Sequence, residues 1–295
     1  MKLHKTLFGF ITLCFLSNTA CETTKGSDDG MLVPEDGVMT FNVVHPAQTR
    51  ATDAGFETDD CIGLYITEQN LPLESAGNYV TNSKLTYDGI IWTPEQKIFW
   101  NDKSYDIFAY YPHQSPVTTI SDLPFEIASD QTTKEGYEAS DFLWATRKNT
   151  GGSQEPVNLI FSHRLSKMNI RLIKGDDYEG ELPEKAEVYI HNTVTSATID
   201  LNVGIVTPNR YGTSRSIKAK KTNKQLYSAI VVPQRINNRQ PLIEIIMEGV
   251  SYIVESSFVF KSGIQHSITL VISKNPEQTK IEIGGEIENW ESQNK

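Results

Sequence analysis

The sequence predicts an all-β fold made of two antiparallel β-sandwich domains in series. Three observations support this: a length of 295 residues, a succession of short runs rich in β-branched and aromatic residues, and no helical periodicity in any window of about a dozen residues. A chain of this length is long enough for two domains that each bury a core. Hydrophobic residues make up 38% and charged residues 22% of the chain, an ordinary balance for a globular protein.

The short β-type runs recur from residue 38 onward and are separated by Gly, Pro, Asn and Asp, as in an all-β sandwich. The last run alternates cleanly, with Ile268, Leu270 and Ile272 on one face, as a half-buried strand requires. The glycine-containing link 261–263 suits a hairpin between the last two runs. The predicted strands are 38–44, 62–67, 105–110, 157–162, 168–173, 186–191, 227–232, 242–247, 252–260 and 266–272.

The predicted domain boundary follows the apolar strand at 157–162. Residues 149–153 form a loop with Gly and Ser upstream of that strand, and a fresh series of strands opens after Leu165. A division there gives two sandwiches of similar size, residues 34–165 and residues 166–295.

The first twenty residues have the features of a secretory signal. Lys2 and Lys5 precede an apolar run over 7–16, and the small residue Ala20 stands just before Cys21. The apolar run is about half the roughly 20 residues that a bilayer-spanning helix needs. We therefore expect residues 1–20 to be a signal peptide rather than a permanent transmembrane helix.

The sequence Asn18-Thr19-Ala20-Cys21 resembles the lipobox of bacterial lipoproteins, in which the cysteine thiol is acylated and becomes the first residue of the mature chain. The resemblance implies a lipid anchor in the outer membrane at Cys21. A polar stretch follows at once and suits a flexible tether, which we place at residues 21–33. Asn18 stands where a lipobox usually has Leu, so ordinary signal-peptidase cleavage is the alternative.

Motifs of catalysis and of cofactor binding are missing from the sequence. It has no Gly-x-Ser-x-Gly elbow, phosphate-binding glycine loop, His-Glu-x-x-His pair or dinucleotide fingerprint. The six histidines are scattered singly, and one cysteine, Cys61, is left after Cys21, so neither a zinc site nor a disulfide is expected. We expect Cys61 to be buried and inert, and His163 to make a hydrogen bond at the domain boundary. The chain is thus predicted to be no enzyme and to need no cofactor or metal.

The charge balance bears on the partners of the chain. Its formal net charge of −10 repels phosphate backbones, so nucleic acid is not an expected partner. Several large aromatic side chains could instead stack on sugars in a carbohydrate-binding module, but aromatic residues in strands more often fill the core, and we expect that here. These residues are Trp92, Trp100, Tyr110, Tyr111 and Trp144.

A series of short motifs follows the signal segment. In order they are Thr40-Phe41-Asn42-Val43, Gln48-Thr49-Arg50-Ala51-Thr52, Asp60-Cys61-Ile62-Gly63-Leu64-Tyr65, Ile98-Phe99-Trp100, Phe108-Ala109-Tyr110-Tyr111-Pro112, Asp141-Phe142-Leu143-Trp144-Ala145, a run over 159–167, and Ile287-Glu288-Asn289-Trp290. This order resembles that of the fimbrillin-like family of the Bacteroidota. The resemblance implies two transthyretin-like sandwiches, a lipid-anchored precursor, and a role as a structural, accessory or anchor subunit of a cell-surface fimbria that supports cell adhesion.

The resemblance also implies a mode of assembly. In some members of the family an arginine-specific protease removes the first strand, and the exposed groove accepts a strand from the next subunit. Here the strand at 38–44 is followed six residues later by Arg50, so the bond between Arg50 and Ala51 is the predicted cleavage site. A sandwich without one strand presents unpaired backbone groups and an open core, which a donated strand satisfies. The predicted partners are therefore like fimbrial subunits and an arginine-specific protease.

Two alternatives stay open at this point. Arg50 could be an ordinary loop arginine, and the chain a monomeric surface lipoprotein that acts as a carbohydrate- or protein-binding module. The segment 279–290 has apolar residues at Ile281, Ile283 and Ile287. It is either the donated strand or the last strand of the second sandwich.

Overall fold

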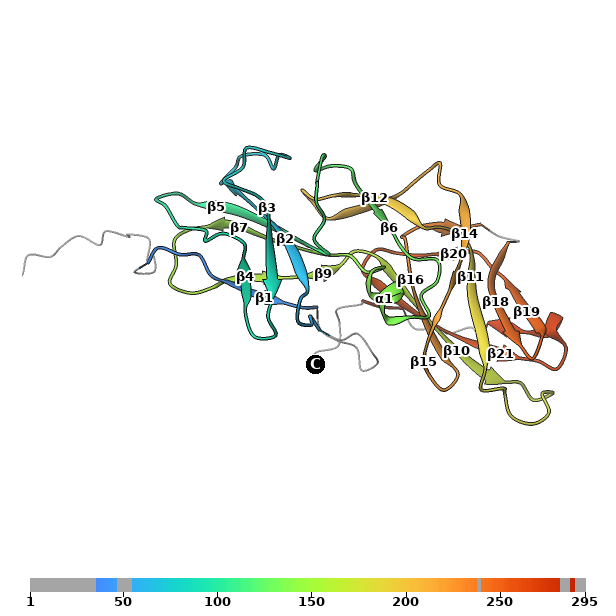
Figure 1. Ribbon diagram of the computed structural model, residues 1–295. Helices are drawn as coiled ribbons and strands as arrows, with labels where there is room; N and C mark the ends of the chain where they lie inside the picture. The colour runs from blue at the N-terminus through green and yellow to red at the C-terminus, as the bar shows by residue number, and fades with distance from the viewer. Residues whose placement is uncertain (1–35, 47–54, 238–239, 282–286, 290–295) are drawn as a thin grey trace, which may run out of the picture. The chain divides into compact units, whose positions relative to one another are not determined.

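The computed structural model describes residues 36–46, 55–237, 240–281 and 287–289 (Figure 1). The described residues belong to one compact unit, residues 31–295. They form 23 strands, a short α-helix α1 (Lys134–Glu138) and a 3-10 turn η1 (Pro276–Gln278). The prediction of an all-β fold is confirmed. The division near Leu165 and the transthyretin-like topology stay predictions.

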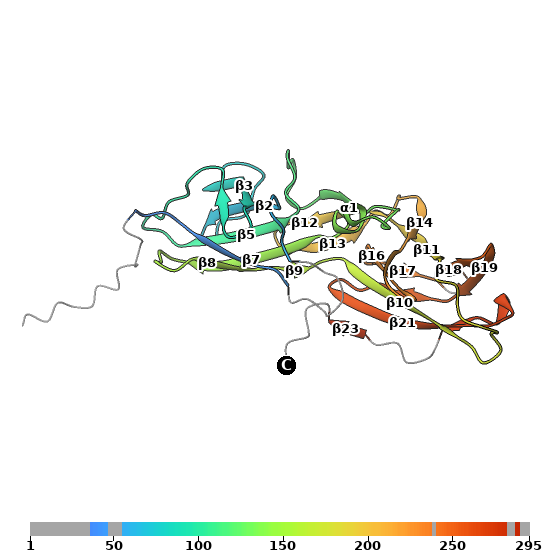
Figure 2. The same cartoon turned by 60° about the horizontal axis from the view of Figure 1, so that its bottom comes forward.

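The first half of the chain builds a six-stranded sheet and a separate two-stranded ladder. The strands of the larger sheet are β4 (Trp92–Pro94), β3 (Val80–Tyr87), β2 (Cys61–Glu68), β5 (Tyr105–Tyr111), β7 (Leu143–Thr150) and β9 (Ser162–His163), in that spatial order. The ladder pairs β1 (Phe41–Val44) with β8 (Val157–Ile160). Figure 1 shows β1 next to β4, and Figure 2 shows β8 next to β7.

The second half builds two further large sheets. One contains β15 (Lys220–Asn223), β16 (Leu226–Val231), β10 (Ser166–Lys174), β21 (Ile264–Ile272) and β22 (Lys280–Ile281), with β23 (Ile287–Asn289) also paired to β21. The other contains β14 (Ser214–Lys218), β11 (Ala186–Val194), β18 (Pro241–Met247) and β19 (Val250–Glu255). The inward faces of β10, β11, β16, β18 and β21 supply most of the core of this half.

Two small sheets complete the described structure. One joins the two halves of the chain, because β6 (Leu123–Glu126) pairs with β12 (Ser196–Asp200), which also pairs with β13 (Ile205–Pro208). The other pairs β17 (Arg235–Ile236) with β20 (Phe258–Val259). Trp144 supports the same junction, since its indole N–H donates to the carbonyl of Leu201 at 2.8 Å.

The buried side chains fall into two clusters. One is built from residues 39–161 and includes Met39, Ile62, Leu64 and Ile107, each at most 1% exposed. The other draws on both halves of the chain, from Tyr65 to Ile272. Burial of this apolar surface is the main stabilising term of such a fold.

The predicted strands all coincide with observed ones, but the predicted hairpin between the last two runs is wrong. The run 252–260 is split into β19 and β20, and β19 pairs with β18 rather than with β21. Glu248 and Gly249 both have positive φ (50° and 81°), which gives the tight two-residue turn that joins β18 to β19. Strand β21 instead lies parallel to β10.

Candidate functional site

The candidate site is the place where β1 is held in the fold. Strand β1 lies parallel to β8, with Phe41 opposite Val157 and Val44 opposite Ile160. The amide of Val157 donates to the carbonyl of Thr40 at 2.8 Å, and the amide of Phe161 donates to the carbonyl of Val44 at 3.0 Å. These bonds fix the register of β1 along one of its two edges.

The segment before β1 is also held along the opposite edge. The amide of Met39 donates to the carbonyl of Ile98 at 2.8 Å, and the amide of Trp100 donates to the carbonyl of Gly37 at 2.7 Å. Gly37 has a φ of 68°, a conformation that glycine adopts without strain. This edge therefore has hydrogen-bonded partners at residues 37–39, before β1 begins.

The side chains of this segment alternate between the core and the surface. Met39 and Phe41 are 1% and 8% exposed and belong to the buried cluster of the first half, against which Val43 is partly buried. On the outward face the side-chain Nδ2 of Asn42 donates to Oδ1 of Asn158 at 2.7 Å. Phe41 of β1 and Met39 just before it thus close the core with two apolar side chains, and one side-chain bond aligns β1 on β8.

A groove of about 700 Å³ runs beside β1. It is lined by residues of β1, by the turn that precedes β4, and by the segment that leads into β8. The lining residues include Phe41, Val43, Phe56, Tyr87, Ile90, Ile91, Trp92, Pro156 and Asn158. Ile90 and Ile91 are 86% and 58% exposed, which is unusual for a pair of neighbouring isoleucines.

Phe56 packs the chain that enters β2 against the β1 region. Its ring lies 4.9 Å from the rings of His45 and Trp92, and 5.6 Å and 5.8 Å from those of Tyr111 and Phe161, all in edge-to-face geometry. Edge-to-face pairs of this kind are each worth about 0.5–1.5 kcal/mol beyond their buried area. The contact between His45 and Phe56 therefore joins the segment before residues 47–54 to the segment after them.

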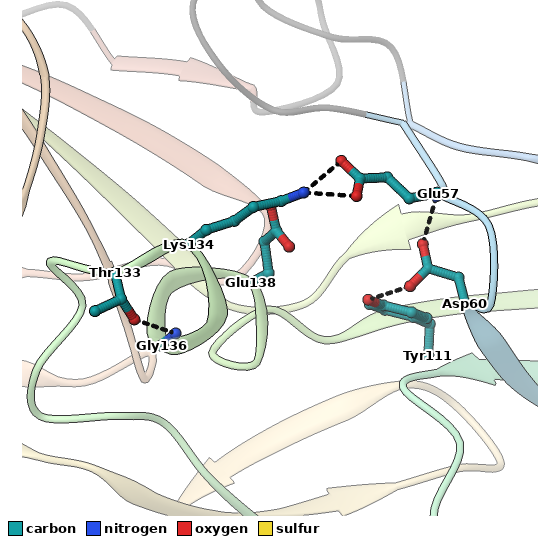
Figure 3. A network of polar contacts seen from close by, with 7 residues as sticks. All are labelled: Glu57, Asp60, Tyr111, Thr133, Lys134, Gly136 and Glu138. Atoms are coloured by element: carbon teal, nitrogen blue, oxygen red, sulfur yellow. Dashed lines mark hydrogen bonds and ion pairs between the residues drawn. The ribbon is translucent and has the colours of Figure 1, made fainter.

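A polar network fixes the same entry to β2 (Figure 3). Both carboxylate oxygens of Glu57 accept from the Lys134 ammonium, at 2.6 Å and 2.7 Å. Asp60 accepts from the amide of Glu57 at 2.7 Å and from the hydroxyl of Tyr111 at 3.1 Å. A small pocket of about 70 Å³ is lined by Glu57, Asp60, Tyr111 and Glu138 among others.

Helix α1 presents Lys134 and Glu138 to this network. The hydroxyl of Thr133 accepts from the amide of Gly136 at 3.1 Å and caps the helix at its N-terminus. Lys134 and Glu57 have side chains that are about half exposed, so their ion pair contributes little free energy and mainly orients the segment.

Burial raises the pKa of two groups near the pocket. Burial raises the pKa of the Tyr111 hydroxyl, and the Asp60 carboxylate raises it further. Burial also raises the pKa of Glu138 above its ordinary value. Tyr111 therefore stays a neutral donor to Asp60, as a structural hydrogen bond requires.

Three site residues predicted from the sequence, Cys21, Arg50 and Ala51, lie outside the described residues. Their roles stay predictions. His163 is 2% exposed, and its Nδ1 lies 2.9 Å from Asp141 Oδ2, so the expected hydrogen bond is present.

Cys61 is half-buried, so the expectation of a buried thiol is wrong in degree. It is the first residue of β2 and lies beside a turn, and its Sγ contacts the carbonyl of Asp59 at 3.2 Å and the hydroxyl of Thr86 at 3.6 Å.

The large aromatic residues are mostly in the core, as predicted. Trp92, Trp100, Tyr110 and Trp144 are at most 8% exposed, and Tyr111 is half-buried beside the small pocket. Rings placed in this way offer no broad exposed platform for a sugar.

Metal sites and membrane-spanning helices were sought in the described part of the chain. There, no group of three or more His, Cys, Asp or Glu side chains is placed to hold a metal ion. Within the same residues, no helix has the length and apolar character needed to cross a bilayer.

The sequence is similar to that of a known bacterial protein. A candidate fimbrium tip subunit of Bacteroides ovatus is 26% identical over an alignment of 143 residues, and the match covers 42% of this chain and 26% of that protein. The chain thus spans about a quarter of the length of the curated relative that it matches.

Solved structures share the fold. A candidate cell adhesion protein from Bacteroides uniformis superposes with a TM-score of 0.65 at 22% identity, over 86% of this chain and 100% of that one. Another from Bacteroides ovatus gives a TM-score of 0.66 at 18% identity, over 87% and 99% of the two chains.

The match to a family model covers most of the chain. The fimbrillin-like model matches residues 49–290, a range that includes β2 to β23 and leaves out β1. The motif order along the sequence resembles the same family. The chain therefore belongs to the fimbrillin-like family.

Proposed function

We propose that the chain is a structural or accessory subunit of a cell-surface fibre, assembled by β-strand exchange between like subunits, and that the fibre supports adhesion. The observation that carries this proposal is the way β1 is held. It is a four-residue strand that pairs with one neighbouring strand, and its Phe41, together with Met39 just before it, closes a core. The relative named as a candidate fimbrium tip subunit supports a place in such a fibre.

Loss of residues 37–46 would create a site that needs a strand. The amides of Trp100, Val157 and Phe161 would lose their acceptors, and the core pocket of Met39 and Phe41 would open to water. Any of these amides that water does not reach would be left unpaired at a cost of about 1–3 kcal/mol. A donated strand with two apolar residues at the same spacing would restore both the bonds and the core.

The precursor in this proposal is anchored to the outer membrane by a lipid on Cys21, through a tether at residues 21–33. An arginine-specific protease cuts between Arg50 and Ala51 and so separates β1, tether and lipid from the rest of the chain. The contacts of His45 and Phe56 support this site of cutting, because they fix the chain on both sides of residues 47–54. The role is structural, and we propose no catalytic activity and no cofactor.

The test is to treat the purified precursor with an arginine-specific protease and to look for a ladder of SDS-resistant oligomers. The wild-type chain should lose its N-terminal segment and form the ladder, whereas Arg50→Gln should stay uncut and monomeric. Arg210→Gln is the matched control, since Arg210 is an exposed arginine in a described turn, and it should behave like the wild type. A clean cut at Arg50 that leaves only monomers would refute strand exchange and favour a monomeric binding module.

A further inference from the structure

A second groove, of about 380 Å³, lies on the surface of the first half of the chain. Two segments line it: residues 79–83, which open β3, and residues 95–99, which lie between β4 and β5 (Figure 1). We call it the Tyr79 groove. Its volume falls within the roughly 300–1,000 Å³ of small-molecule sites. Six of its ten lining residues are polar, so the ligand that fits must itself be rich in hydrogen-bond donors and acceptors.

Two partly exposed aromatic rings lie in the Tyr79 groove. Tyr79 and Phe99 are 40% and 46% exposed. One face of the Tyr79 ring stacks on the ring of Tyr105, with centroids 4.8 Å apart and an interplanar angle of 26°. Because Tyr105 is fully buried, the exposed surface of Tyr79 is its other face and its edge. A ring that is backed by the core and open on one side is a surface on which the C–H groups of a sugar can stack.

These rings are held in place by the fold. The Tyr79 hydroxyl donates to the carbonyl of Phe99 at 2.5 Å, and this bond joins the two segments that line the groove. The neighbouring Ile98 is 6% exposed, and its carbonyl accepts from the amide of Met39 at 2.8 Å. A ligand that binds here therefore does not have to order the two segments, and the entropic cost of binding is low.

Three polar side chains at the rim are available to a ligand. Glu95, Gln96 and Lys97 are exposed, and within the described part of the chain no hydrogen bond or ion pair engages their side chains. They offer a carboxylate, a carboxamide and an ammonium, which together accept from and donate to hydroxyl groups. Polar groups of this kind beside a stacking ring are suited to a carbohydrate.

The charges of the chain favour a neutral ligand. Glu95 and Lys97 have opposite signs and lie two residues apart, so the three rim residues carry no net charge. The whole chain has a formal net charge of −10, which repels polyanions. An acidic polysaccharide is thus disfavoured.

We propose that the Tyr79 groove binds a neutral oligosaccharide. One sugar ring stacks on Tyr79 and Phe99, and its hydroxyl groups bond to Glu95, Gln96 and Lys97. The inference rests on the proposed function for its purpose, because it gives the adhesive fibre a class of ligand. Binding needs no second subunit, since all of these residues belong to one chain.

The test measures sugar binding to the purified uncut chain by isothermal titration calorimetry. The neutral probes are lactose, N-acetyllactosamine, maltotriose, cellotriose and mannotriose, and sialyllactose is the acidic counterpart of lactose. We expect at least one neutral sugar to bind saturably at millimolar concentration or below, and sialyllactose to bind no better than lactose. Lack of binding by all the neutral sugars, or binding of sialyllactose alone, would overturn the proposal.

Variants of the two rings test the stacking. Tyr79→Phe and Tyr79→Ala both lose the hydrogen bond to Phe99, and only Tyr79→Ala loses the ring, so its affinity should be lower by at least about tenfold. Phe99→Ala should also weaken binding by at least about tenfold. Its matched control is Tyr211→Ala, which removes a 97% exposed ring elsewhere and should leave affinity unchanged. Wild-type affinity in both Tyr79→Ala and Phe99→Ala would refute the site.

A further variant tests the polar rim. Gln96→Ala should weaken binding by about threefold to tenfold, because one hydrogen bond to the sugar is lost. The exposed residue Gln154 lies outside the groove, so Gln154→Ala is the matched control and should bind like the wild type. An unchanged melting temperature in Gln96→Ala and Phe99→Ala would show that a loss of affinity is not a loss of fold.

Failure of this inference is distinguishable from failure of the proposed function. If no neutral sugar binds but the cut chain still forms the SDS-resistant ladder, strand exchange stands and the sugar site is refuted. If a neutral sugar binds and Phe99→Ala weakens its binding, but the cut chain forms no ladder, the sugar site stands and strand exchange is refuted.

Discussion

Phe41→Ala should loosen β1 without unfolding the rest of the chain. Phe41 is 8% exposed and packs in the core cluster of the first half. Replacing a buried Phe by Ala costs about 3–5 kcal/mol in a closed core. Water can enter from the neighbouring groove and reduce the cavity cost, so we expect about 2–3 kcal/mol here. This loss of free energy weakens the attachment of β1 and leaves the rest of the fold in place.

Hydrogen exchange measures this loosening directly. The amides of Val157 and Phe161 are protected by bonds to β1, so a loss of about 2 kcal/mol should speed their exchange about 30-fold or more. Val44→Ala is the control on the same strand, because Val44 is 39% exposed and its truncation should change exchange by less than about threefold. Equal effects of the two variants, or unchanged exchange in Phe41→Ala, would refute the assignment of Phe41 as the anchor of β1.

Three further predictions concern the rest of the fold. Burial lowers the pKa of His266 to about 4, whereas the unfolded residue has a pKa of about 6.5. Between these values only the unfolded chain takes up the proton, so the free energy of unfolding, measured in urea, should fall by up to about 3 kcal/mol from pH 6.5 to pH 4. In His266→Gln the free energy of unfolding should depend less on pH over this range. Gly204→Ala should lower the melting temperature markedly, because Gly204 has a φ of 68° and an added Cβ would lie 2.6 Å from the Trp144 ring. The control is Gly180→Ala in an exposed turn, where an added Cβ meets no atom within 4 Å, so this change should cost only its backbone strain. Gln131→Leu should lower the free energy of unfolding, measured in urea, by about 2–4 kcal/mol. The reason is that the buried side-chain amide of Gln131 bonds both backbone groups of Ile230, each at 2.8 Å. A loss below about 0.5 kcal/mol would show that these bonds are dispensable.

The strands with a regular apolar pattern could be predicted from the sequence. Ile268, Leu270 and Ile272 alternate along β21 and are at most 8% exposed, as a half-buried strand requires. Strand β3 was not predicted, because its sequence Val-Thr-Asn-Ser-Lys-Leu-Thr-Tyr has one fully buried residue, Leu85. Pairing with β2 and β4 forms this strand, and local sequence does not reveal such pairing.

The candidate site could be predicted in part. The strand at 38–44 stands out as an apolar run, and its side-chain alternation places Met39 and Phe41 inward. Its partner β8 could not be predicted, since Asn42 and Asn158 are 116 residues apart and nothing local joins them. Ile90, Ile91 and Phe56 were missed for the same reason. Each lies outside the predicted strands and gains its role from contacts made only in the folded chain.

The energetics of β1 explain why a single cut would be enough to release it. In the intact chain β1 is joined to β2 through residues 47–54, so its pairing with β8 is intramolecular. Met39 and Phe41 together contribute about 3–6 kcal/mol of apolar burial. A cut at Arg50 makes the same contacts intermolecular, and association then costs an estimated 4–15 kcal/mol. The four backbone pairs with β8 add only modest net stability, since hydrogen bonds to water replace them when they break. In the proposed exchange β1 would therefore be a weak ligand of its own site after cleavage, and a longer strand from a second copy could displace it.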